Sequence, residues 1–152
     1  MKKVNVRFET EINKEDIDVL ITASEKDEEV RALIDRVSDP LSDALTVYDA
    51  EGRALILREE DIVSLSSSNK RVRILASDGE YELRMSMQDV EKLLDPRAFI
   101  RISRYEIINL RKVERFDFSV SGTLRIGLSG GRETWASRRS IPGIKERLKG
   151  RK

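Results

Sequence analysis

The stretch Phe99-Ile-Arg-Ile-Ser-Arg-Tyr-Glu-Ile-Ile-Asn109 sets two arginines and a serine among residues that favour β-strands. On a strand, Arg101 and Ser103 would face solvent, while the isoleucines on either side of Arg101 face a core. Arg104 falls where the strand breaks into a loop. Its guanidinium can there bind a phosphate or fork onto O6 and N7 of guanine. The structural alternative is a surface ion pair with Glu106.

A second segment repeats this arrangement about thirty residues later. Trp135-Ala-Ser-Arg-Arg-Ser140 again takes a strand end into serine and arginine, just before a predicted helix. Unpaired N–H groups at a helix start favour an anion, and the hydroxyl of Ser137 adds a donor beside Arg138 and Arg139. The alternative is a helix cap at Ser140 with two solvated arginines. We interpret the two segments as two walls of one anion-binding surface, with DNA as the favoured ligand.

A third basic cluster follows the polar turn Ser66-Ser-Ser-Asn69. It contains Lys70, Arg71 and Arg73. Taken singly, this cluster also has the pattern of a charged hairpin tip in solvent. Its place in a DNA-binding surface therefore depends on whether the fold brings it close to the other two segments.

The charge of the chain is divided unevenly along its length. Residues 1–96 carry 14 Lys and Arg against 23 Asp and Glu. Residues 97–152 carry 15 Lys and Arg, 11 of them Arg, against 5 Asp and Glu. Such asymmetry indicates a basic face for a polyanion and an acidic part kept away from it. Arginine also suits bidentate phosphate and guanine contacts better than lysine does. An uneven but functionless surface charge is the alternative.

The composition argues against several other classes. The sequence contains no Cys and no His, so a disulfide framework is impossible and a zinc site is not expected. No motif announces a nucleophile, a phosphate loop or a paired acid and base, so we predict no enzyme activity, no cofactor and no small-molecule substrate. The sequence has no apolar run of membrane-span length and no signal-peptide core, which predicts a cytoplasmic protein.

Short alternating segments separated by turn signals dominate the chain from about Ala44 and predict a mainly β fold, α+β overall. Residues 1–43 predict a small N-terminal β-β-α segment, with strands at 4–9 and 18–23 and a helix that begins after Ser24. This segment is too small to be an independent domain, so we expect it to serve dimerisation or partner docking. Residues 44–152 form the second predicted domain, with helices after Ser86 and Ser140.

Four pieces of the sequence together resemble the LytTR family of DNA-binding domains. The first two are the strand with its polar turn at 58–65 and the strand and helix at 81–94. The third is the stretch 99–109, which is similar to the family's Phe-x-Arg-x-His-Arg-Ser-Tyr-Ile-Val-Asn. The fourth is Ala136-Ser-Arg-Arg139, which is similar to the family's closing Val-Ser-Arg-Arg. Their order and spacing also fit, over about residues 44–149.

The resemblance implies an elongated, mostly antiparallel β domain whose loops enter successive major grooves and read imperfect direct repeats. It implies base contacts from Arg104 and Arg139, a further contact from Lys70 or Arg71, and a backbone contact from Ser137. One position departs from the family pattern: Ser103 stands where the family usually has His, which bears on the base preference.

The 43 residues before this domain leave no room for a receiver domain, so we expect a stand-alone regulator whose input is not phosphorylation. The leading hypothesis is a sequence-specific bacterial transcription regulator that binds double-stranded DNA as a homodimer, without a helix-turn-helix. The resemblance also implies a small membrane protein as a regulator of such stand-alone members. The alternative hypothesis is a β-rich interaction module whose basic face binds an acidic protein.

Overall fold

The computed structural model describes residues 2–38, 43–118 and 122–149. The chain divides into two compact units, Met1–Ser42 and Asp43–Lys152.

The first unit contains one helix, α1 (Glu28–Ser38). The sequence pattern predicts its start directly after Ser24, at residue 25, but the helix begins three residues later, at Glu28. The Oδ1 atom of Asp27 accepts a hydrogen bond from the N–H of Val30 at 3.0 Å, so Asp27 caps the helix. Two glutamates follow in the first turn, where negative charge is favourable beside the helix dipole.

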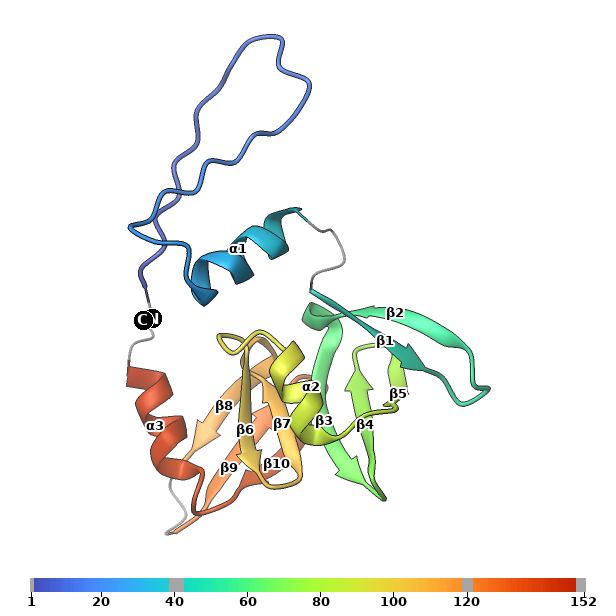
Figure 1. Ribbon diagram of the computed structural model, residues 1–152. Helices are drawn as coiled ribbons and strands as arrows, with labels where there is room; N and C mark the ends of the chain where they lie inside the picture. Colours follow the sequence, from blue (N-terminus) through green and yellow to red (C-terminus); the bar gives the residue numbers. More distant parts are fainter. Residues whose placement is uncertain (1, 39–42, 119–121, 150–152) are drawn as a thin grey trace. The chain divides into compact units, whose positions relative to one another are not determined.

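The two strands expected at 4–9 and 18–23 are not formed: the described residues 2–27 contain no strand. Figure 1 draws this part as two long runs joined by a turn. Alternation alone does not make a strand, because two strands without a third or a covering layer are marginal in water. The apolar side chains here remain exposed, Val6 at 92% and Phe8 at 86%.

The second unit is mainly β, as the sequence predicts, and it contains two antiparallel sheets. The larger sheet has the strand order β2-β1-β5-β4-β3-β7-β6, and the smaller has the order β10-β9-β8. The strands of the larger sheet are β1 (Ala44–Tyr48), β2 (Ala54–Arg58), β3 (Ile62–Ser68), β4 (Arg71–Ala76), β5 (Gly79–Leu83), β6 (Phe99–Ser103) and β7 (Glu106–Asn109). The strands of the smaller sheet are β8 (Val113–Asp117), β9 (Leu124–Leu128) and β10 (Arg132–Ala136).

Two helices and two 3-10 turns complete this unit. The helices are α2 (Met87–Leu93) and α3 (Ile141–Lys149), and the 3-10 turns are Glu59–Asp61 and Leu110–Lys112. Ser86 caps α2 as predicted, because its side chain accepts a hydrogen bond from the N–H of Asp89.

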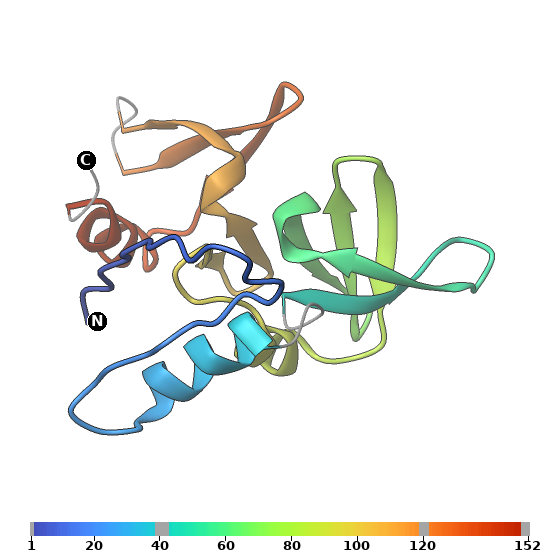
Figure 2. The same ribbon diagram turned by 90° about the horizontal axis from the view of Figure 1, so that it is seen from above.

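The stretch 99–109 forms the β6–β7 hairpin, which lies between two hydrophobic cores. Phe99 and Ile107 belong to the core that the larger sheet shares with α2. Ile102 and Ile108 belong to the core that contains β9 and α3. Figure 2 shows β8–β10 on one side of the hairpin and β1–β5 on the other. A fully buried isoleucine stabilises the fold by about 1.5–3 kcal/mol, so a hairpin that is apolar on both faces holds both cores together.

Asn109 ends the hairpin and is fully buried. Its amide nitrogen donates to the carbonyl oxygens of Ile62 at 2.8 Å and Glu59 at 3.3 Å, while its Oδ1 accepts from the N–H of Arg111. The Asn109 side chain thus holds this turn through backbone groups.

Candidate nucleic-acid interface

Arg104 occupies the two-residue turn between β6 and β7, together with Tyr105. Its side chain is exposed, and its guanidinium carbon lies 5.9 Å from the centre of the Tyr105 ring. Among the described residues it contacts no carboxylate, and Glu106 instead accepts a hydrogen bond from Thr134 at 2.7 Å. The ion pair between Arg104 and Glu106, which the sequence left open, is therefore not formed.

Ser103 and Arg101 hold this turn from the side of β6. The hydroxyl oxygen of Ser103 accepts a hydrogen bond from the N–H of Tyr105 at 3.1 Å. The guanidinium of Arg101 donates to the carbonyl oxygens of Ser103 at 3.2 Å and Arg104 at 2.7 Å, and it pairs with Glu91 of α2 at 2.6 Å. Arg101 was expected to face solvent, but three of its N–H groups are used inside the molecule.

Lys70 lies at the tip of the β3–β4 hairpin. Asn69 and Lys70 have φ angles of +48° and +67°, the pattern of a type I′ turn. The neighbouring Arg71 forms an ion pair with Glu82 of β5, with 2.6 Å between its Nη1 and Oε1. Lys70 thus lies in the turn itself, whereas Arg71 and Arg73 lie on β4.

The junction between β10 and α3 carries Arg138 and Arg139, both exposed. The hydroxyls of Ser137 and Ser140 lie 2.8 Å apart, and the N–H of Ser140 donates to the carbonyl of Ser137 at 3.0 Å. Ser140 thus begins the helix, as predicted, since the N–H of Ile144 bonds to its carbonyl oxygen. The two serines fix the junction, and the two arginines project from it.

Two main-chain hydrogen bonds bring the three basic segments to one edge of the second unit. The N–H of Ser67, near the end of β3, donates to the carbonyl of Tyr105 at 2.8 Å. The N–H of Ser137 donates to the carbonyl of Ile102 at 2.7 Å. The β3–β4 turn, the β6–β7 turn and the β10–α3 junction therefore lie in a row, along the lower edge of Figure 1. We call this row the basic edge.

The chemistry of the basic edge is that of an anion-binding surface. It combines exposed lysine and arginine side chains with serine hydroxyls, which are common partners of phosphates. Carboxylates also lie nearby: Glu82 and Glu91 pair with Arg71 and Arg101, and the carboxyl of Glu106 lies half-buried at the β6–β7 turn. Burial raises the pKa of Glu106, and the hydrogen bond from Thr134 offsets part of that rise.

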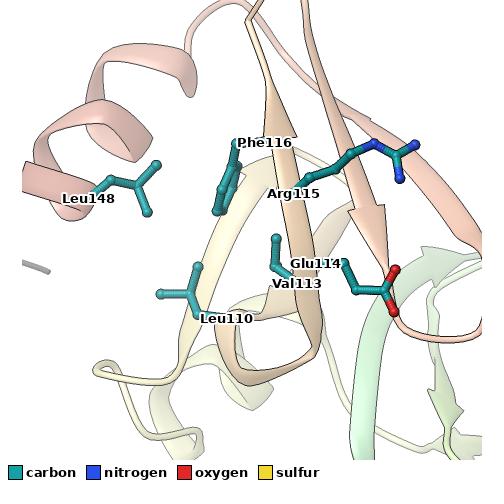
Figure 3. A pocket seen from close by; sticks show the side chains of 6 residues that line it. All are labelled: Leu110, Val113, Glu114, Arg115, Phe116 and Leu148. Atoms are coloured by element: carbon teal, nitrogen blue, oxygen red, sulfur yellow. The ribbon is translucent and has the colours of Figure 1, made fainter. Parts of the chain in front are cut away.

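Surface hollows elsewhere in the unit lack comparable chemistry. One of about 140 Å³ lies between β8 and α3, and Figure 3 shows Leu148 and Phe116 facing each other across it while Arg115 points away. Another of about 310 Å³ is bordered by Arg101 and Glu91. The part of the chain that the structure describes holds no cluster of acidic side chains suited to a metal ion. None of its helices is long and apolar enough to cross a membrane.

The second unit is thus a mainly antiparallel β domain with a row of exposed cations along one edge. The chain belongs to the family of LytTr DNA-binding domains, whose sequence profile matches residues 52–149. The LytTr domain of a methyl-accepting/DNA response regulator from Bacillus cereus has the same fold, with a TM-score of 0.66 and 19% identity over 70% of this chain and 97% of that one.

Relatives also match along the full chain. Two Staphylococcus aureus proteins, from strains MSSA476 and MW2, are each 30% identical over 148 residues, which span 97% of this chain and 99% of theirs. Both are described as HTH-type transcriptional regulators. In the described residues of this chain strands separate α2 from α3, so the basic edge is made without a helix-turn-helix.

Proposed function

We propose that this protein is a transcription regulator that binds specific double-stranded DNA sequences through the basic edge. The observation that carries the proposal is the pair of hydrogen bonds, Ser67 to Tyr105 and Ser137 to Ile102, which align three basic segments far apart in sequence. The relatives described as transcriptional regulators support the regulatory role.

In this proposal Arg104 and Arg139 read base edges in the major groove. Both are exposed at chain reversals, from which a long side chain can reach into a groove. A guanidinium can bind O6 and N7 of guanine together, and one such bidentate contact gives about 1–3 kcal/mol of discrimination.

The remaining cations and hydroxyls serve mainly as phosphate contacts, which position the protein without reading sequence. Lys70, Arg138 and Ser137 are assigned this role directly. Arg71 joins them if it exchanges Glu82 for a phosphate. Arg101 and Ser103 position the β6–β7 turn instead of contacting DNA, since their polar atoms already form hydrogen bonds within it.

The protein binds imperfect direct repeats as a homodimer, in line with the family resemblance. Selection from a randomised double-stranded DNA pool at near-physiological salt tests both points. We expect enrichment of a spaced direct repeat, with affinity that falls steeply as salt rises because phosphate contacts release counterions. Weak, salt-sensitive binding without any enriched sequence would contradict sequence recognition and favour an acidic protein as the partner of the basic edge.

A further inference from the structure

The first unit carries apolar side chains that no described residue covers. They alternate with polar residues along two extended runs, and they include Val6 at 92% exposure, Phe8 at 86% and Ile17 at 92%. Large apolar side chains exposed in series mark an interaction surface rather than a solvated one.

The turn between the runs sets which residues face each other. Asn13 has a φ of +66°, which reverses the chain after Ile12. If the runs pair about this turn, Phe8 faces Ile17, and the neighbouring apolar residues meet on the same side. Three ion pairs join charged residues of the runs: Lys14 pairs with Glu11 at 3.5 Å and with Asp18 at 2.5 Å, and Arg7 pairs with Glu9 at 3.0 Å. In that pairing these charged residues would lie on the opposite side from the apolar ones.

A hairpin with one apolar face requires further strands, because two strands alone are marginal. The first run is self-complementary in an antiparallel pair centred on Val6. Each Val4 would then face Phe8 of the second copy, and each Lys3 would face Glu9. A two-fold axis repeats both contacts, as an interface between identical chains requires.

Other positions of the two-fold axis along this run give less favourable pairs of facing side chains. An axis at Arg7 would set two arginines against each other, and an axis at Asn5 would set Lys3 against Arg7. An axis at Phe8 would use Ile12, which lies in the turn. A shift by one residue would place every apolar side chain opposite a polar one.

We propose that the first unit is half of a two-chain structure, in which residues 3–9 pair antiparallel with the same residues of a second copy about Val6. This inference specifies the homodimer of the proposed function. The S. aureus relatives share this unit, since their match extends to 97% of the chain, whereas the family profile begins at residue 52.

Disulfide cross-linking of the full chain tests the register, because the native sequence contains no cysteine. In Val6→Cys the two thiols would meet at the axis, at the separation a disulfide requires, so we expect a covalent dimer under mild oxidation. Ile17→Cys is the matched control, since Ile17 has the same 92% exposure but lies on the second run. It should stay uncross-linked.

A charge swap provides a second, reversible measurement. We expect Lys3→Glu to weaken self-association, measured by sedimentation equilibrium, by about tenfold or more, and the double variant Lys3→Glu with Glu9→Lys to restore it.

A monomeric wild-type chain at high concentration, equal cross-linking of both cysteine variants, or a swap that fails to restore association would each overturn the inference. Titration of a single DNA half-site separates this result from the proposed function. A monomeric chain that still binds the half-site contradicts only the interface, and a dimer that binds no DNA contradicts only the function.

Discussion

Arg101 and Arg104 are three residues apart and have opposite surroundings. Arg104 extends from the turn, whereas Arg101 donates to two of the turn's carbonyl groups and pairs with Glu91. We infer that Arg101 positions the turn from which Arg104 reaches DNA. The charge of the two arginines is the same, but their hydrogen-bond partners distinguish the positioning role of Arg101 from the exposed position of Arg104.

Arg101→Lys tests the positioning role, because it keeps the charge but loses the forked donor geometry. We expect a loss of about 1.5–3 kcal/mol in folding free energy and weaker DNA binding, measured by urea unfolding and by titration of the selected site. Glu91→Gln is the control, since it leaves the turn carbonyls bonded to Arg101 and should bind DNA as the wild type does. If Arg101→Lys binds normally while Arg101→Ala does not, Arg101 is a phosphate contact instead.

Glu106 gives a prediction about pH. Burial raises its pKa in the folded chain, so protonation stabilises the fold, and that stabilisation is lost as pH rises from the unfolded pKa through the folded one. Glu106→Gln stays neutral throughout. The melting temperature of Glu106→Gln should therefore exceed that of wild type by more at about pH 7 than at about pH 4, where the wild-type carboxyl is mostly protonated. An equal difference at both pH values would contradict the assignment.

At the scale of elements, the β3–β4 turn holds Lys70, a proposed phosphate contact, in a strained backbone conformation. Lys70 holds a left-handed conformation at φ +67°, which costs a non-glycine residue about 1–2 kcal/mol. Lys70→Gly should raise the free energy of unfolding by about 1 kcal/mol, because glycine adopts this conformation without strain.

The same change should weaken DNA binding and lower the salt dependence by about one ion, because one phosphate contact is lost. Lys70→Asn separates the two effects, since asparagine tolerates the conformation but carries no charge. A Lys70→Gly variant that is more stable and binds as well as wild type would remove Lys70 from the basic edge.

The elements of the second unit were largely predictable from alternation, turn residues and caps, such as Ser86 before α2. What alternation did not predict is which surfaces become covered. The strands expected at 4–9 and 18–23 follow the same pattern as β4 and β5 but lack a third strand in the described chain. Local pattern specifies a strand only when tertiary structure supplies its neighbour.

The candidate site was predictable as a set of residues but not as an arrangement. Arginine and serine at the strand ends indicated the cations of the basic edge. The inward bonds of Arg101 and the link from Ser67 to Tyr105 join residues distant along the chain or depend on side-chain geometry, and no single-sequence pattern encodes them.

At the scale of the whole molecule, negative and positive charge are concentrated in different parts of the chain. The acidic residues concentrate before residue 97, and the surplus of arginine follows it. A surplus of exposed cations along one edge would steer a polyanion toward that edge. We propose that the basic edge recognises base sequence and not merely charge.

The most direct test measures Arg104→Ala and Arg139→Ala on the selected DNA site and on versions with each base pair replaced. Arg132→Ala, an exposed arginine at the opposite end of β10, is the matched control for charge. We predict that each reading variant loses about 1–3 kcal/mol on the selected site and tolerates substitution at its own base pair, while Arg132→Ala keeps the full base preference. Unchanged base preference in both reading variants would contradict the account.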